Sequence, residues 1–430
     1  MLADATGRGI AETGTTTYRP PYVPVPIAAF GAGSQGMGFA PRRLTTSDAA
    51  ARARGAVMIE TGLWYRPAYF PQPGETHWRQ SCDREVAMVR GHVGVCDVST
   101  LGKIDVQGPD AAAFLDFVYA GTMSTLKVGR VRYGLMLRED GFVMDDGTAA
   151  RLGERHFVIT TTTAAAGQVM RHLDWVQQGL CPDMDVRFVS VTEQWAQFAV
   201  TGPMAQALLA GLIDAPLDGA DWPFMACGAV TVGGIAGRLF RISFSGEAGY
   251  EIAVPARYGA ALYRELVARA EAAGGGAYGL EALNVMRIEK GFITHAEIHG
   301  RVTAADVGMG RMVAAGKDCV GKVMAARPGL TEDRQVLVGL RPVGVVRQVI
   351  AGAHLFPADG PVSPETDLGY ITSAAYSPTL GTMLALGFVR GGRERLGQTL
   401  RMIDHMRGIE AICEVTDPVA YDPDGGRMRG

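Results

Sequence analysis

The sequence predicts an α+β protein in which two similar α+β halves precede a small β-barrel or sandwich. The chain has 430 residues, 47% of them hydrophobic. It can therefore form two or three packed units of the usual size, about 100 to 200 residues each. A strand, a Gly-Pro pair and a helical pattern occur at residues 104–120 and again at 197–212, which indicates two related units. Beyond residue 334, short strand patterns alternate with glycine, proline and charged turns, as in a small barrel or sandwich.

Residues 1–60 are expected to form an extended arm rich in proline and glycine. Four prolines between residues 20 and 26 and a glycine cluster at 31–38 prevent regular hydrogen-bonded pairing. Residues 31–36 match the dinucleotide pattern G-x-G-x-x-G by letter. That motif requires a preceding strand and a following helix. Prolines flank this stretch instead, so we do not expect a nucleotide site here.

Regular elements are expected from residue 79, with a domain boundary near residue 330. Pro109 opens one helix, because proline in the first turn loses no hydrogen bond. We expect domains at 61–330 and 331–430. The predicted helices are 84–90, 109–120, 203–212, 256–273 and 279–290; the predicted strands are 93–98, 102–106, 130–137, 142–152, 157–163, 197–200, 238–244, 250–254, 336–340, 369–373, 383–388 and 407–415.

The charge balance favours a small-molecule ligand. A net charge of -3 from 41 basic and 44 acidic residues gives no electrostatic footprint for nucleic acid or anionic lipid. The six cysteines form no C-x-x-C pair, which fits a reducing compartment. No segment approaches the roughly 20 apolar residues of a membrane helix. We therefore expect a cytoplasmic protein with neither a membrane nor a nucleic-acid partner.

Asp145 and Asp146 are the first candidates for chemistry. Adjacent strand residues point to opposite faces, so only one of the two carboxylates can enter a given pocket. A turn pair is the alternative for these residues taken alone. Four threonines at 160–163 place hydroxyls on each face of a neighbouring strand, where they bond a ligand or pair across strands.

Glu247 and Glu251 bracket a second candidate stretch. Tyr250 and Ile252 alternate with Glu251 in an apolar strand pattern, so this carboxylate needs a partner once buried. A ligand rich in N–H donors is one such partner, and a solvated surface pair of glutamates is the alternative.

Two further groups are interpreted as structural. Arg287 and Glu289 are two apart on a predicted helix and cannot face each other, so each is expected to enter a separate buried ion pair. His295 and His299 have the i, i+4 spacing of a metal pair, but no third ligand is nearby. No metal site is expected.

Short segments between residues 79 and 420 follow a fixed order: Cys96–Lys103, Tyr133–Leu137, Gly141–Asp146, Ser245–Glu251, Met286–Gly291, Lys317–Lys322 and Thr372–Gly381. In order and spacing they resemble the aminomethyltransferase family, typified by the T-protein of the glycine cleavage system. Together with residues 12–22 and 191–196, they look most like the C-terminal folate-binding half of the alpha subunit of heterotetrameric sarcosine oxidase. In that subunit a dinucleotide-binding region precedes this part, so we expect the chain to be a fragment of a longer subunit or a short paralogue.

The resemblance implies a three-domain cloverleaf, two related α+β domains plus a C-terminal β-barrel, around a tetrahydrofolate pocket. Asp146 would be the catalytic carboxylate, and Glu251 would hold the pterin, whose 2-amino-4-oxopyrimidine edge offers two parallel N–H donors to a carboxylate. The cofactor-binding set implied by the resemblance is Glu251, Phe244, Tyr133, Thr161 and Glu247. The T-protein has Gly-Ala-Arg-Asp where this chain reads Glu281 to Asn284, and tyrosine at the position of Phe244.

The implied reaction is tetrahydrofolate-dependent one-carbon transfer. An imine or formaldehyde equivalent from sarcosine-type amine oxidation would be converted into 5,10-methylenetetrahydrofolate, and Asp146 would stabilise the developing cation or move a proton. Oxidation itself would occur on flavin-bearing oxidase subunits as partners. The alternatives are a freestanding aminomethyltransferase or demethylase acting on another small amine or thioether, and a non-catalytic assembly subunit of an amine oxidase complex.

Overall fold

The computed structural model describes residues 6–7, 43–219, 221–346 and 348–430. Most of the expected arm, including the glycine pattern at 31–36, lies outside these residues. The arm was expected to reach residue 60, and this is wrong for its last part. Residues 48–61 form α4 (Asp48–Ala53) and β1 (Val57–Thr61), and β1 pairs with β2 (Trp64–Tyr69). The alanine-rich sequence of α4 favours a helix, and Arg52 bonds Asp48 one turn away at 2.9 Å.

The first sheet has five antiparallel strands in the order β5-β6-β7-β4-β8. One face carries alternating apolar residues, such as Ile104 and Phe157, that pack under two helices and form a buried core. The other face packs against the second sheet, because Val131 and Ala150 share a buried cluster with Phe240 and Ala253. The strands are β4 (Gly102–Gln107), β5 (Arg130–Leu137), β6 (Val143–Gly153), β7 (His156–Thr161) and β8 (Arg187–Ser190), and the helices are α6 (Ala111–Val118) and α7 (Ala166–Trp175).

The second sheet has six strands in the order β10-β11-β12-β9-β3-β13. Helices α8 (Ala205–Leu209) and α9 (Gly259–Ala272) cover one of its faces. β3 comes before β4 in sequence yet pairs with β9, so the two units are not simply consecutive, as the sequence suggested. The strands are β3 (Gly94–Asp97), β9 (Trp195–Thr201), β10 (Cys227–Val232), β11 (Ile235–Phe240), β12 (Gly249–Pro255) and β13 (Gly276–Ala277).

The repeated Gly-Pro turn is present in both units. Gly108 and Gly202 adopt φ of 141° and 127° after β4 and β9, a region that favours glycine. A Cβ at Gly108 would lie 2.2 Å from the carbonyl oxygen of Asp185, and one at Gly202 would lie 2.5 Å from that of His92. The sequence similarity therefore reflects the same tight approach of backbone to backbone.

The C-terminal unit is a closed six-stranded barrel in the order β14-β17-β16-β15-β18-β19. Together with the two mixed units, it confirms the predicted α+β class with a terminal barrel. Alternate residues of β16 are buried, as expected for strands that line a barrel core. The strands are β14 (Gln335–Pro342), β15 (His354–Pro357), β16 (Gly369–Ser377), β17 (Thr382–Arg390), β18 (Thr399–Asp404) and β19 (Ile409–Thr416).

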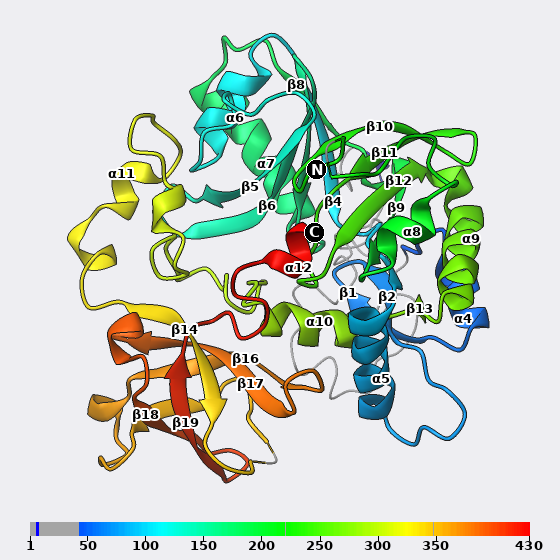
Figure 1. Ribbon diagram of the computed structural model, residues 1–430. Helices are drawn as coiled ribbons and strands as arrows, with labels where there is room; N and C mark the ends of the chain where they lie inside the picture. Colours follow the sequence, from blue (N-terminus) through cyan, green and yellow to red (C-terminus); the bar gives the residue numbers. More distant parts are fainter. Residues whose placement is uncertain (1–5, 8–42, 220, 347) are drawn as a thin grey trace.

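Two helices and the C-terminal segment join the three units. α10 (Leu280–Glu289) lies between the barrel and the α+β region, and α5 (Trp78–Gly91) packs beside it (Figure 1). After the barrel the chain returns to the centre and ends with α12 (Gly426–Arg429). The central apolar cluster contains residues from both sheets, α5, α10 and the barrel.

A buried ion-pair cluster centred on Arg90 lies at this junction. The Arg90 guanidinium donates to Glu247 at 2.9 Å and also to Glu289. Tyr421 and Arg427 from the C-terminal segment donate to Glu247 at 2.8 Å and 3.0 Å. The Arg90 cluster, meaning these five residues, therefore ties α5, α10, the turn before β12 and the C-terminal segment together.

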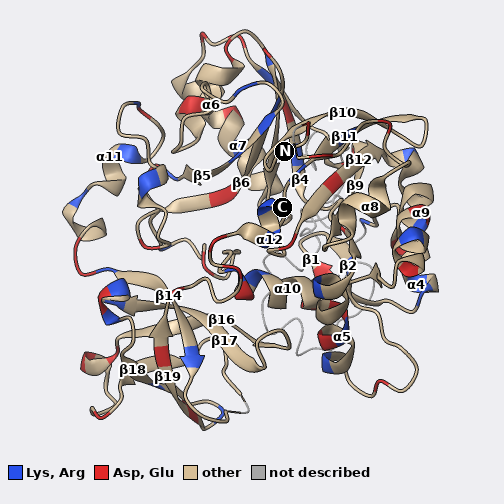
Figure 2. Cartoon of the chain, in the orientation of Figure 1, with Lys and Arg blue, Asp and Glu red and all other residues tan. Residues whose placement is uncertain are grey.

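Charged residues of both signs are interspersed over the described elements (Figure 2), in line with the small net charge of -3. Among the described residues, none of the helices combines the length and apolar composition that crossing a bilayer requires.

We expect Arg90→Met to lower the free energy of unfolding by about 3–5 kcal/mol, because it leaves buried Glu289 without a cation and Glu247 with Arg427 alone. Arg341→Met is the control, since the Arg341–Glu414 pair is exposed and such pairs contribute at most about 1 kcal/mol. Urea unfolding of both variants measures the difference. Equal, small losses would show that the Arg90 cluster does not stabilise the junction.

Candidate functional site

Asp146 lies on β6 with its carboxylate on the face of the first sheet opposite to the helices. It pairs across the ladder with Leu135 of β5, and cross-strand partners share a face. The Tyr133 hydroxyl, on the same face, donates to Asp146 Oδ2 at 2.7 Å. The register of β5 and β6 shifts just before the aspartates, a bulge of the kind that often re-aims side chains near functional sites.

Asp145 points to the other face, as strand alternation predicts. It is 3% exposed, and its two oxygens accept from the backbone N–H and the hydroxyl of Thr162 at 3.1 Å and 2.9 Å. The alternative of a turn pair is wrong, because both aspartates belong to β6. Asp145 therefore binds the residue that follows β7. Of the two aspartates, only Asp146 lies on the open face, meaning the face of the first sheet opposite to the helices.

Burial dominates the electrostatics of this pair. It raises the pKa of Asp146 to about 6, with a further contribution from the negative charge of Glu297, while the Tyr133 hydrogen bond opposes the rise. Burial, and after it the Asp146 charge, also raises the pKa of Tyr133. The phenol is thus a proton donor to Asp146 at neutral pH, and the carboxylate is ionised but readily protonated.

Glu251 occupies the matching position on the second sheet. It lies on β12, is 8% exposed, and pairs with Ala199 of β9. Gln197 donates its side-chain N–H to Oε2 of Glu251. Within the described chain, Oε1 has no hydrogen-bond partner. Burial raises the pKa of Glu251, while the Gln197 bond and the charges of Lys103 and Arg66 oppose this rise. A carboxylate on a buried residue with one oxygen free of a donor fits a ligand that offers N–H groups.

The two carboxylates lie on sheet faces that face each other. Leu135, the ladder partner of Asp146, and Ala199, the ladder partner of Glu251, belong to the same central cluster. Farther along the same faces, Val131 of β5 packs with Phe240 of β11 in a second shared cluster. Asp146 and Glu251 are thus presented from opposite sheets to one junction between the domains.

Lys103 is a site residue that the sequence reasoning did not single out. It lies on β4, pairs with Thr160 of β7, and shares the open face with Asp146. Its side chain is buried, and it lies close enough to Glu251 to influence its ionisation. Its position was visible in the sequence, because Ile104 and Val106 define the covered face of this strand and leave Lys103 on the other.

Thr161 was expected to line the pocket, but it lies on the face covered by helices. It is 2% exposed and donates to the carbonyl oxygen of Thr162 at 2.8 Å. A Cβ at Gly102 would lie 2.1 Å from its hydroxyl and 2.8 Å from Ala166 of α7. The neighbouring Thr160 is on the open face, where its hydroxyl lies 2.9 Å from that of Thr148. The physical reason is strand alternation, which puts Thr160 rather than Thr161 beside Asp146.

Phe244 and Glu247 lie in the turn that precedes β12, not in a strand that reaches residue 244. Phe244 is 38% exposed and stacks on Phe292 with ring centroids 5.5 Å apart. Glu247 is 1% exposed, so the alternative of a solvated pair of glutamates is wrong. Its carboxylate accepts from the Arg90 cluster, and we assign it a structural role rather than a place at the ligand.

Arg287 and Glu289 enter two separate ion pairs, as predicted. Arg287 bonds Glu297 at 3.0 Å, and Glu289 bonds Arg90. His299 contacts the Tyr370 hydroxyl at 2.6 Å. No group of three or more potential metal ligands occurs among the described residues.

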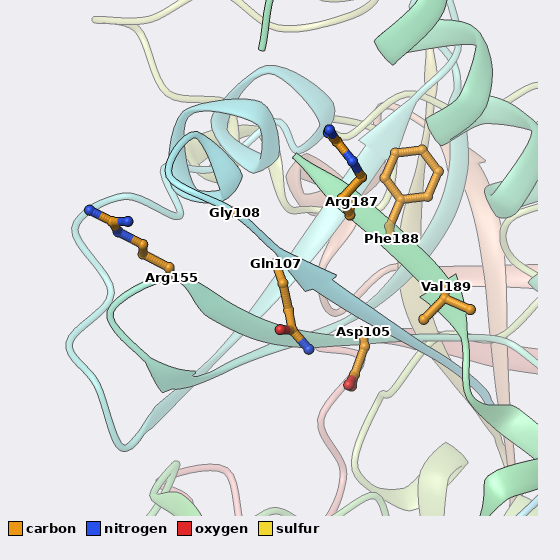
Figure 3. A pocket seen from close by; sticks show the side chains of 7 residues that line it. All are labelled: Asp105, Gln107, Gly108, Arg155, Arg187, Phe188 and Val189. Atoms are coloured by element: carbon orange, nitrogen blue, oxygen red, sulfur yellow. The ribbon is translucent and has the colours of Figure 1, made fainter. Parts of the chain in front are cut away.

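A cavity of about 530 Å³ lies at the outer end of β4 and β8. Asp105 and Gln107 of β4 and Arg187 of β8 are among the residues that line it (Figure 3). Neither Asp146 nor Glu251 lines it.

Comparison with known protein families identifies the chain. A model of the GCVT N-terminal domain matches residues 48–317, and a model of the glycine cleavage T-protein C-terminal barrel domain matches 335–422. The chain belongs to the glycine cleavage T-protein family. A model of the sarcosine oxidase A3 domain also matches residues 1–34. The resemblance seen in the sequence is confirmed.

Individual members of the glycine cleavage T-protein family agree with this assignment. The chain is 46% identical to sarcosine oxidase subunit alpha of Rhizobium meliloti (strain 1021), over 100% of the chain and 44% of that subunit. It is 34% identical to the aminomethyltransferase of Streptomyces coelicolor, over 81% of the chain and 89% of that protein. The chain thus spans less than half of the sarcosine oxidase alpha subunits that it matches.

A solved structure of the family has the same fold. The glycine cleavage system aminomethyltransferase T from Bartonella henselae superposes with a TM-score of 0.75, at 24% identity over 89% of this chain and 98% of that one. This shows the aminomethyltransferase fold predicted from the sequence.

We expect the stability of the protein to fall as pH rises from about 4 to about 7, partly because of Asp146. Its pKa of about 6 in the folded state exceeds the unfolded value near 3.9, so folding binds a proton between these two values. Each pH unit within this window then lowers the free energy of unfolding by on the order of 1.4 kcal/mol.

Asp146→Asn removes this cost. Urea midpoints of the variant and the wild type should diverge in favour of the variant as pH increases, whereas a control Asp318→Asn at an exposed position should run parallel to the wild type. A gap that stays constant with pH would contradict a raised pKa for Asp146.

Proposed function

We propose that the protein binds tetrahydrofolate between the two facing sheets and transfers a one-carbon unit to it. The unit would be an imine or formaldehyde equivalent from sarcosine-type amine oxidation, and the product would be 5,10-methylenetetrahydrofolate. The observation that carries the proposal is the placement of Asp146 and Glu251 on opposing faces at one junction. Family membership and the similarity to sarcosine oxidase alpha subunits support it.

Glu251 is suited to bind the pterin ring. The 2-amino-4-oxopyrimidine edge of a pterin carries parallel N–H donors, which a carboxylate accepts in a bidentate manner. Glu251 is fixed from one side by Gln197 and keeps Oε1 available. Its burial excludes competing water, so a bond made there is stronger than one at the surface.

Asp146 is suited to act on the one-carbon unit. When bound, tetrahydrofolate supplies two nitrogens that take up this unit. An ionised Asp146 stabilises positive charge that develops near it, and its raised pKa of about 6 allows it to hold or release a proton near neutral pH. The Tyr133 hydrogen bond, 2.7 Å long, keeps the carboxylate oriented.

The positions that depart from the T-protein pattern concern the rest of the ligand. Leu283 packs against the central cluster, and the side-chain oxygen of Asn284 accepts from Arg287 at 2.9 Å. Phe244 offers a partly exposed ring beside Phe292. These contacts are apolar or already satisfied, so we place the polar recognition at Glu251. We further propose that flavin-bearing oxidase chains supply the one-carbon unit.

Calorimetric titration of tetrahydrofolate into the wild type, Glu251→Gln and Asp146→Asn tests these roles. Glu251→Gln should weaken binding by roughly tenfold to a hundredfold, because a charge-assisted acceptor is lost. Asp146→Asn should bind normally and lose at least about a hundredfold of the enzyme-dependent methylene transfer from formaldehyde. Glu410→Gln, at an exposed barrel position, is the control.

If the wild type does not bind tetrahydrofolate, the remaining hypothesis is a non-catalytic assembly subunit. Binding without transfer from formaldehyde, but with transfer from another amine or thioether, would favour the freestanding transferase.

The pH profile of kcat/KM gives a further prediction. Because Asp146 acts ionised, the rate should fall as pH decreases through about 6. The Tyr133 hydroxyl stabilises the charged form, so Tyr133→Phe should move this acidic limb to higher pH. The midpoint of the limb in both proteins is the measurement. An unchanged midpoint would show that a group other than Asp146 sets the limb.

A further inference from the structure

Glu251 belongs to a hydrogen-bonded chain that includes a buried lysine. The Ser99 hydroxyl accepts from the Gln197 backbone N–H at 2.9 Å and donates to the Gln197 carbonyl oxygen at 3.1 Å. The Gln197 side chain donates to Glu251, and the Ser99 carbonyl oxygen accepts from Lys103 Nζ at 2.6 Å. Ser99 therefore fixes Lys103 and the Gln197–Glu251 pair next to each other.

Lys103 retains an unused donor in this arrangement. Its ammonium has three N–H groups, and two of them are given to Ser99 and, at 2.9 Å, to the carbonyl oxygen of Leu101. The third has no hydrogen-bond partner within the described chain. The side chain is only 2% exposed, and leaving a donor of a buried charge unpaired is costly. A ligand acceptor would satisfy it.

We infer that Lys103 is a specificity-determining residue, which donates to a ring carbonyl oxygen next to the N–H groups bound by Glu251. This inference rests on the proposed function and deepens it. A 2-amino-4-oxo ring presents two donors and then an acceptor along one edge. Glu251 supplies the acceptor oxygens and Lys103 the donor, so the two residues together match this order. Replacing the 4-oxo group by a 4-amino group places a donor against the Lys103 donor.

The charged groups around Lys103 support this role. Asp97 on β3 and Glu251 on β12 favour its protonated form, Arg66 on β2 disfavours it, and burial, the largest influence, lowers its pKa to about 8. At neutral pH the lysine is therefore mainly charged. A protonated 4-amino ring would meet this positive charge, whereas a neutral 4-oxo ring would not.

The test compares tetrahydrofolate with its 4-amino-4-deoxy analogue, in which the acceptor at position 4 becomes a donor and N3 loses its hydrogen. Calorimetry of the wild type should show tighter binding of the 4-oxo compound, by roughly tenfold to a hundredfold. In Lys103→Met the affinity for tetrahydrofolate should fall by a similar factor and the preference should shrink to the part that Glu251 contributes through N3–H. Lys317→Met is the matched control, because Lys317 also donates to two backbone carbonyl oxygens, those of Asp116 and Tyr119.

A second measurement needs no substitution. The 4-oxo preference of the wild type should decline as pH rises through about 8, where Lys103 loses its proton. If Lys103→Met fails to fold, this profile decides the question alone.

The outcomes separate the inference from the proposed function. Tetrahydrofolate binding with an undiminished 4-oxo preference in Lys103→Met, or with a preference independent of pH, overturns the inference and leaves the proposed function standing. No binding of either compound by the wild type overturns both.

Discussion

The Arg90 cluster is the interaction on which the arrangement of this protein depends. One guanidinium neutralises two buried carboxylates, Glu247 and Glu289, that belong to the turn before β12 and to α10. The Arg90 guanidinium also lies 3.9 Å from the ring centre of Tyr421, so the C-terminal segment closes over it. Buried ions require complete pairing, and here complete pairing requires α5, α10, the turn before β12 and the C-terminal segment to be in place together. The same turn leads into the strand that carries Glu251, so the position of Glu251 is fixed by contacts remote from it.

The candidate site depends on a difference in composition between the two faces of each sheet. Apolar residues fill the helix-covered faces, and the faces that meet carry Asp146, Lys103, Glu251 and Gln197 among apolar neighbours. Taking these polar groups out of water shifts their protonation equilibria toward neutrality, which is what a proton-handling site near neutral pH needs.

Much of this architecture could be predicted from the sequence, and the limits have physical causes. The strand at 130–137 was predicted with its observed bounds, and the one at 142–152 to within a residue, because their apolar alternation is strong. β1 and α4 were missed because the proline-rich stretch before them hid an alanine-rich helix. Helix 203–212 is shorter than predicted, since only Ala205–Leu209 is helical. The pairing of β3 with β9 depends on contacts about a hundred residues apart, which local patterns do not contain.

The surroundings of the residues predicted for the site agree with the sequence only in part. Asp146 over Asp145, and Glu251 as a buried acceptor, followed from motif position and strand alternation. Thr161 lies away from the open face because strand alternation, which was not applied to β7, puts Thr160 there instead. The structural surroundings of Glu247 could not be foreseen, because its partners Tyr421 and Arg427 lie more than 170 residues away in the sequence. Lys103 was overlooked although its strand pattern placed it on the open face.

The return of the chain from the barrel to the centre has a consequence for biosynthesis. Glu247 and the turn around it emerge from the ribosome long before Tyr421 and Arg427, which supply part of its hydrogen bonding. Until residues 421–427 are translated, Glu247 has only Arg90 as a cation. The loop that positions the start of β12 therefore reaches its final form only after these residues have been made, so a nascent chain can hold both sheets before Glu247 is fully paired.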